Sequence, residues 1–341
     1  MNQESGGPVA ISAPPAVASG PRARLSDLMQ RRLGGVNPGL LVALVVLFVG
    51  LSLFSPYFFA STNLLNIGRA MAIVGIASVG ETIVIISGGF DLSVGSVMAA
   101  SGMISAFLIG VGVPLPAAFA VSIGAGIGIG LFNGAIVGYA RINPLIATLA
   151  TMSIVRGLAY VLSGGKEIVV DNQAWVSFGT DTFLFIPFIV LVLLATFLVA
   201  GLAMPRTIFG RYAYAIGSSA RASRLAGVAG NRWRLAFYVS CAGLAAVAGL
   251  VAVARIGYAQ PSGYAGIELD VITAVILGGA SLSGGRGTVL GTLVGLALIG
   301  VINNGLTLAG VPAYWQLVVK GSILLAAVVY DELRRARQDE S

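Results

Sequence analysis

Few side chains in this 341-residue chain could do chemistry. Two acidic residues, Glu81 and Asp91, and one basic residue, Lys320, interrupt long apolar stretches. A charge near the middle of a bilayer costs about 2.5–3.5 kcal/mol on insertion scales, so each should face protein or water rather than lipid. Structural pairing and a role in a permeation path both fit this placement. Proton coupling through Glu81 and Asp91 would indicate an ion-coupled secondary transporter.

The composition excludes most catalytic sites. The chain has no histidine, which removes Ser-His-Asp and Cys-His nucleophiles and most zinc sites. Its one cysteine, Cys241, lies in an apolar block and is expected to be a packing residue. Gly164-Gly165-Lys166 and Gly284-Gly285-Arg286 lack the spacing of a phosphate-binding P-loop. We therefore expect that the protein is not an enzyme and binds no metal or cofactor. If it moves a solute against a concentration gradient, the energy must come from an ion gradient or from a separate ATPase.

These residues are set in an unusually apolar chain, with 57% hydrophobic and 10% charged residues. A membrane-spanning helix needs about 20 apolar residues, and lipid-exposed backbone must satisfy its own hydrogen bonds. The sequence therefore predicts an all-α, polytopic transmembrane helix bundle of about ten spans. The predicted spans are 39–55, 66–87, 92–112, 114–139, 144–162, 184–204, 235–256, 268–283, 287–309 and 313–331. The eighth is short and interrupted by glycine, and the fifth contains Arg156, so either of them could cross only partly.

The basic residues predict an orientation. With the N-terminus inside and alternating spans, fifteen of the 20 Lys and Arg residues collect on the cytoplasmic side, as the positive-inside rule requires. The exceptions are Arg69, Arg156, Lys166, Arg255 and Lys320. Both termini are then cytoplasmic. The orientation in the bilayer explains the net charge of +7, so no nucleic-acid partner is expected. We expect a disordered basic tail over residues 1–38 with Arg22, Arg24, Arg31 and Arg32, a transmembrane domain over 39–333, and a cytoplasmic tail over 334–341.

Two glycine-rich segments break the apolar pattern. Ser87–Gly95 contains Gly88, Gly89, Asp91 and Ser93. Asp91 could cap the next helix, because a carboxylate accepts from free N–H groups there, and it could also belong to a substrate-facing or gating turn.

The second glycine-rich segment contains Gly278, Gly279 and Ser281, and both segments read I-x-G-G-x-x-L-S-x-G. Broken segments in corresponding halves often mark a transport path. An inverted repeat would put the two turns on opposite sides, whereas the predicted topology puts both in the cytoplasm.

A relatively polar, basic stretch over residues 205–234 predicts a short helix. Ala220 to Ala226 can be helical, with Ser218 or Ser219 as the cap and Gly227 as the stop. Arg221 and Arg224 are three residues apart and share a face, and Leu225 adds an apolar contact. The stretch could lie on anionic headgroups or dock a cytoplasmic partner, and its compact amphipathic form favours docking.

Glycines at intervals of four predict close helix packing. Gly126, Gly130, Gly134 and Gly138 lie on one face of a span, and Gly287, Gly291 and Gly295 repeat the spacing. A glycine-lined path is the alternative.

Together these segments resemble the permease subunits of ribose/xylose/arabinose-type ABC importers, within the wider family that includes branched-chain amino-acid permeases. The family turn resembles G-G-I-D-L-S-V-G, and Phe90 replaces its Ile. Glu81 stands where an uncharged polar residue is expected. The likeness covers about residues 39–333. Its matching positions are Gly88 through Gly95, the coupling-loop residues Gly210, Arg211, Gly217, Ala220, Arg221, Arg224, Leu225 and Gly227, and Leu269-Asp270 through Gly287, Asn303-Asn304-Gly305-Leu306, Tyr314-Trp315-Gln316-Leu317 and Lys320-Gly321.

The resemblance implies partners and a place in the cell. It implies a homodimer of permeases in the bacterial inner membrane, a cytoplasmic ATPase that binds the ATP, and a periplasmic or extracellular sugar-binding protein. It also implies a substrate path near Asn303 and Asn304, in addition to the two glycine-rich turns. A secondary transporter and an ABC permease for a non-sugar solute remain the alternatives, and the sequence does not name the sugar.

Overall fold

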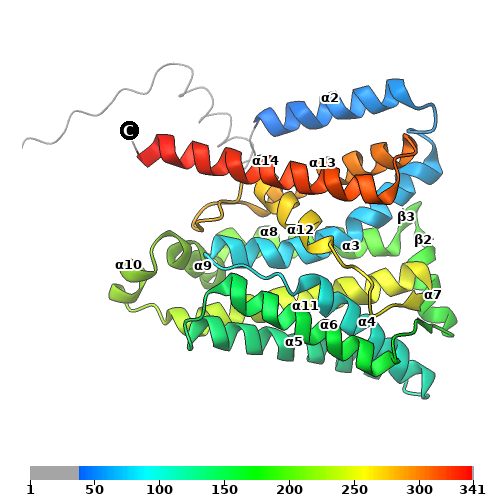
Figure 1. Cartoon of the computed structure of the whole chain (residues 1–341), viewed down its shortest axis with the longest axis horizontal. Coiled ribbons are helices and arrows are strands. Elements are labelled where there is room, and N and C mark those ends of the chain that lie inside the picture. Colours follow the sequence, from blue (N-terminus) through cyan, green and yellow to red (C-terminus); the bar gives the residue numbers. More distant parts are fainter. Residues whose placement is uncertain (1–37, 340–341) are drawn as a thin grey trace, which may run out of the picture.

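The computed structural model of the protein describes residues 38–339. Most of these residues lie in helices, and the long helices run along one common direction (Figure 1). The predicted basic tail with Arg22, Arg24, Arg31 and Arg32 lies outside the described residues. The N-terminal half contains α2 (Pro38–Phe54), α3 (Ser61–Ile86), α4 (Val94–Gly110), α5 (Leu115–Gly138), α6 (Pro144–Ser163) and α7 (Gln173–Thr180). The C-terminal half contains α8 (Phe188–Arg206), α9 (Ile208–Ser218), α10 (Ala220–Leu225), α11 (Gly230–Ile256), α12 (Ile267–Leu277), α13 (Val289–Leu308) and α14 (Ala313–Asp339).

Each of the ten predicted spans contains a helix. Seven helical segments within the described residues are long and apolar enough to cross a membrane: α3, α5, α6, α8, α11, α13 and Ala313–Leu333 of α14. The apolar helices α2 and α4 have 17 residues each, and α12 has 11, which agrees with its short predicted span. The protein is therefore a multi-pass membrane protein, because this much apolar helix needs a hydrocarbon environment.

The centre of the bundle is α11. Its most extensive contacts are with α5, α3 and α4, whereas α2 and α14 lie at the edge and pack on α13 and α12. The outer helices α2, α8 and α6 expose apolar side chains such as Val46, Val199 and Val161. An exposed apolar surface of this kind is unfavourable in water and suits lipid.

The glycine face of α5 explains how α11 comes so close. A Cβ at Gly130 would lie 2.6 Å from the carbonyl oxygen of Tyr238, and one at Gly134 would lie 2.6 Å from the Cα of Leu235. This confirms close packing as the role of the predicted glycine stripe. In the second set, Gly291 and Gly295 pack on α12 in the same way. Gly287, however, precedes the helix in a loop with φ of +141°, so it is not part of the helical stripe that the spacing predicted.

The two ends of the bundle differ in character. The basic end carries α9, α10 and the loop at residues 139–143, and it lies opposite α7 in Figure 1. The strand end carries α7 and four two-residue strands: β1 (Ile168–Val169), β2 (Thr182–Phe183), β3 (Ile186–Pro187) and β4 (Tyr258–Ala259). β1 pairs antiparallel with β4, and β2 pairs with β3. An entirely helical chain was predicted, and these strands are too short to leave a hydropathy signal.

Candidate translocation and coupling sites

The first glycine-rich turn is held by a buried polar cluster. One carboxylate oxygen of Asp91 accepts from the backbone N–H of Ser93 at 2.8 Å and from its hydroxyl at 2.5 Å. The amide of Asn133, on α5, donates to the Ser93 hydroxyl at 3.0 Å. Ser93 is the N-cap of α4, so Asp91 braces the turn just before the helix instead of capping it directly. The side chains of Asp91 and Ser93 are buried and line neither cavity described below.

Glu81 and Tyr238 complete the bracing of this turn. Glu81 Oε1 accepts from the backbone N–H of Asp91 at 3.2 Å, and its other oxygen lies 3.7 Å from the sulfur of Cys241. The Tyr238 hydroxyl accepts from the Phe90 N–H at 3.2 Å and donates to the Phe90 carbonyl at 3.0 Å. Glu81 is fully buried and bonded within the protein, which supports a structural role. The roles of Tyr238 and Asn133 were not predicted, because their partners lie far away in the sequence.

Lys320 also has a structural partner. Its ammonium group lies 2.6 Å from a carboxylate oxygen of Asp270 on α12, and both side chains are largely buried. Of the two interpretations left open by the sequence, pairing is therefore the one the structure supports for Lys320. The pair ties α14 to the short helix α12.

The two glycine-rich turns meet at the basic end. The backbone N–H of Gly285 donates to the carbonyl of Ile86 at 2.8 Å. A Cβ at Gly284 would lie 2.8 Å from the Cα of Gly88. Both turns therefore lie at one end of the bundle, as the predicted topology required, and an inverted relation between them is wrong. Ser281 and its neighbour Leu282 donate to Asp331 of α14 at 3.2 and 3.3 Å.

The C-terminal part of α9 contacts both turns. A Cβ at Gly217 would clash with the carbonyl oxygen of Ile86 and lie 2.5 Å from the nitrogen of Gly285. The Tyr214 hydroxyl donates to the carbonyl of Gly287 at 2.9 Å, and burial raises its pKa, so it stays a protonated donor. Movement of α9 would therefore be transmitted directly to both turns.

The predicted short helix is confirmed as α10. The Ser219 side chain caps it by accepting from the Ala222 N–H at 3.1 Å, and Gly227, with φ of +81°, follows its end. Arg221, Arg224 and Leu225 are exposed, and Leu225 has 85% of its surface accessible. Gly210 packs tightly on Met204 at the preceding bend.

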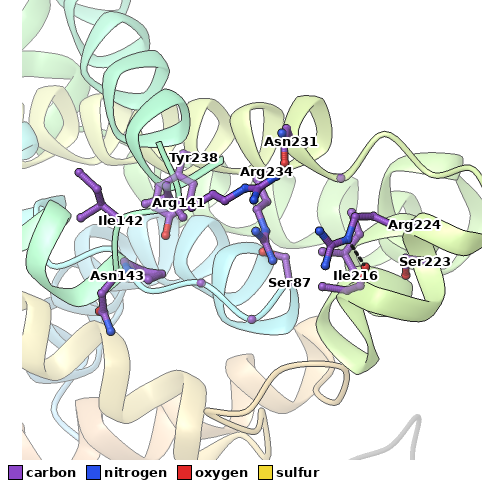
Figure 2. A pocket seen from close by; sticks show the side chains of 16 residues that line it. Ser87, Arg141, Ile142, Asn143, Ile216, Ser223, Arg224, Asn231, Arg234 and Tyr238 are labelled. Atoms are coloured by element: carbon purple, nitrogen blue, oxygen red, sulfur yellow. Dashed lines mark hydrogen bonds between the residues drawn. The ribbon is translucent and has the colours of Figure 1, made fainter. Parts of the chain in front are cut away.

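A cavity of about 400 Å³ separates α10 from the first turn. Gly88 and Gly89 of the turn line it, together with Ser223 and Arg224 of α10. Figure 2 shows Arg141 and Arg234 on its other side. Two residues of the predicted gating turn, Gly88 and Gly89, and two of the predicted coupling residues, Ala220 and Arg224, thus share one cavity.

A second cavity of about 410 Å³ lies near the strand end, between α3, α13 and α14. Its polar lining is rich in side-chain amides, which come from Asn63, Asn66, Asn303, Asn304 and Gln316. The other polar lining residues are Thr307, Arg255 and Lys320. Asn63 and Asn304 bond to each other at 2.7 and 3.2 Å. The buried oxygen of the Asn303 side chain has no partner within the described residues.

The predicted path residues therefore do not form one site. Gly88 and Gly89 line the cavity at the basic end, and Asn303 and Asn304 line the amide cavity. Gly278 packs against Gly291 of α13, and Gly279 takes a φ of +92° in the turn that follows α12. Gly278, Gly279 and Ser281 line neither cavity.

Comparison with known proteins agrees with this architecture. The family described as branched-chain amino acid transport system / permease component matches residues 63–328. Ribose import permease protein RbsC of Escherichia coli (strain K12) is 40% identical over 301 residues, covering 86% of this chain and 93% of the relative. RbsC of Bacillus subtilis (strain 168) is 40% identical over 300 residues, 87% of this chain and 93% of the relative.

L-arabinose transport system permease protein AraH of Escherichia coli (strain K12) is 37% identical over 297 residues, 87% of this chain and 90% of the relative. No solved structure matches the chain. The family resemblance that the signature turn and coupling loop predicted is confirmed over most of the sequence. The chain belongs to the family of permease components of branched-chain amino acid transport systems.

Proposed function

We propose that this protein is the transmembrane permease subunit of an ATP-driven importer for a monosaccharide of the ribose type. The observation that carries the proposal is its 40% identity, over 93% of the relative, to a ribose import permease. The amide cavity supports it, because amide groups both donate to and accept from the hydroxyl groups of a sugar.

The direction and partners belong to the same proposal. The basic end faces the cytoplasm of a bacterial inner membrane, ten spans place both termini there, and the strand end faces a periplasmic or extracellular sugar-binding protein. Two permease copies form the pathway. A cytoplasmic ATPase docks on α10, and the permease itself carries no catalytic site. The absence of a P-loop from the sequence fits an external motor.

The contacts at the basic end suggest how the motor acts. ATP binding would move the ATPase subunits and the exposed face of α10. The tight contact of Gly217 with Ile86 and Gly285 would carry that movement into both turns. The two packings of the spans then alternate, and each opens the path to one side.

A reconstitution experiment tests the proposal. Permease in liposomes should accumulate radiolabelled ribose only with its ATPase, its binding protein and ATP. Arg221→Glu combined with Leu225→Asp should abolish ATPase association and reduce uptake at least tenfold while the permease still folds, because both side chains are exposed. Lys166→Glu, in an exposed loop at the strand end, is the matched charge control.

Three results would contradict the proposal. Accumulation by the permease alone under a proton or sodium gradient would favour a secondary transporter. Normal uptake by the Arg221→Glu, Leu225→Asp variant would show that the motor does not act through α10. Competition by an excess of an unlabelled amino acid, but not of sugars, would assign a non-sugar solute.

A further inference from the structure

We propose that the cavity between α10 and the first glycine-rich turn binds a phosphate-bearing anion. The ligand chemistry is a phosphate ester, supplied either by a small phosphorylated molecule in the cytoplasm or by a phospholipid headgroup. The binding site stands on its own geometry, and only its regulatory consequence rests on the proposed function.

The lining of the cavity is strongly basic. Arg141 comes from the loop before α6, Arg224 from α10 and Arg234 from the first turns of α11, so three distant segments each supply a guanidinium group. None of the sixteen lining residues is acidic. Figure 2 shows the three arginines around the same opening.

Within the part of the chain that the structure describes, these positive charges have no carboxylate partner. Arg224 donates from Nε to the carbonyl of Ala220 at 3.3 Å, which holds its side chain along α10 and leaves its terminal nitrogens without a described partner. Three like charges around one cavity repel each other, and an anion between them removes that repulsion. Guanidinium groups match phosphate oxygens in bidentate geometry.

Neutral donors add to the site. The Asn143 side-chain oxygen accepts from the Leu145 N–H at 2.9 Å, so its amide nitrogen remains a donor for the cavity. Asn231, which is half-buried on α11, and the buried Ser223 of α10 also line the cavity. A phosphate ester offers several acceptor oxygens and would use arginine and amide donors together.

Different residues of α10 serve the cavity and the proposed docking surface. Arg221 and Leu225 lie outside the cavity lining, and both are exposed. The buried Ser223 and the exposed Arg224 of the same helix do line the cavity, so Arg221 and Arg224 differ in this respect although their spacing predicted a shared face. A protein seated on the outward face would leave the cavity of about 400 Å³ open to a small molecule.

Occupancy would affect transport. An anion that contacts Arg224 on α10 and Arg141 and Arg234 on the bundle would fix α10 relative to the first turn. The ligand would then favour one of the two packings and slow the cycle, as any ligand does that prefers one state. A phosphorylated product of the imported solute has the required chemistry for such inhibition from the cytoplasm.

The test uses the full-length permease alone, in nanodiscs of phosphatidylcholine, so it does not depend on transport. Ribose 5-phosphate and inorganic phosphate are the free probes, ribose is the uncharged control, and added phosphatidylglycerol is the lipid probe. Binding is measured by equilibrium dialysis and by the thermal unfolding midpoint at fixed ionic strength. The variants are Arg224→Gln and Arg234→Gln, matched by Arg221→Gln on the same helix and Arg232→Gln on the same turn, neither of which lines the cavity.

We expect ribose 5-phosphate to bind, with affinity reduced at least tenfold in Arg224→Gln and Arg234→Gln and less than twofold in the two controls. If only phosphatidylglycerol raises the midpoint, and the cavity variants abolish that rise, the phosphate comes from lipid. The inference is overturned if no probe binds, or if the control variants lose as much affinity as the cavity variants. It is equally overturned if Arg224→Gln and Arg234→Gln bind every probe with the affinity of the unmodified protein.

Discussion

At the scale of single residues, burial and partners separate structural side chains from those free to meet a solute. Asp91, Ser93 and Glu81 are buried and bonded within the turn, although Asp91 keeps one oxygen without a described partner. Asn303 differs, because its half-buried side chain lines the amide cavity and makes no described hydrogen bond. A side chain of this kind can contribute to recognition without contributing to the fold.

Asn303→Leu should therefore lower sugar uptake about tenfold while changing stability little. The reason is that it removes an amide available to a sugar hydroxyl but no internal hydrogen bond. Initial uptake rates in liposomes check the effect on transport, and the thermal unfolding midpoint checks the effect on stability. Asn304→Leu is the structural comparison, since it breaks the bonds with Asn63 and should lower the midpoint. Unchanged uptake in Asn303→Leu would exclude the amide cavity from the path.

Gly217 is the residue on which the coupling contact depends. Gly217→Ala should destabilise the protein by about 1–3 kcal/mol and strongly reduce ATP-driven uptake, because its Cβ would push Ile86 and Gly285 apart. Gly201→Ala in α8 is the matched control, since nothing lies within 4 Å of its Cβ. Thermal unfolding and uptake are the measurements. A Gly217→Ala protein with normal stability and uptake would contradict the contact.

At the scale of elements, the face of a helix decides what a glycine does. Gly130 on α5 faces α11, whereas Gly128 on the same helix has nothing within 4 Å of its Cβ. Spacing by four predicted the packed face, but not which helix packs there. That partner, α11, follows α5 by about a hundred residues and is fixed by long-range packing.

Gly130→Ala should lower the free energy of unfolding by about 1–3 kcal/mol, because its Cβ would press on Tyr238, Val239 and Ala242. Gly128→Ala should leave stability unchanged or raise it by up to about 1 kcal/mol, since alanine favours a helix over glycine. Thermal unfolding of both variants in the same detergent compares the two faces directly. Equal effects of the two substitutions would count against the close α5–α11 contact.

At the scale of the whole molecule, charge asymmetry predicts the orientation in the membrane. The connections between spans at the basic end carry Arg141, Arg211 and Arg221, of which the last two lie in the short helices α9 and α10. At the strand end, Arg69 donates to the Thr180 carbonyl at 2.8 Å. Arginines in short loops resist translocation across the membrane, so the basic end should remain in the cytoplasm.

Cysteine labelling in intact cells checks this orientation. Phe185→Cys, in the exposed β2–β3 hairpin, should react with a membrane-impermeant maleimide added outside. Leu225→Cys on α10 should react only after the cells are opened. The native Cys241 is fully buried and gives a low background in both variants. Labelling of Leu225→Cys from outside intact cells would show that α10 faces the exterior. It would contradict both the predicted orientation and the docking of a cytoplasmic ATPase on α10.

The sequence by itself determined the elements whose signals are local. Apolar blocks marked the spans, basic residues marked one end, and Ser219 and Gly227 bounded α10, because hydropathy, charge and caps act over one helix length. Only the tertiary structure decided that Gly88, Gly217 and Gly284 meet, that Lys320 pairs with Asp270, and that the predicted path residues divide between two cavities. These contacts join residues from 50 to almost 200 positions apart, and they arise from side-chain packing that no local pattern encodes.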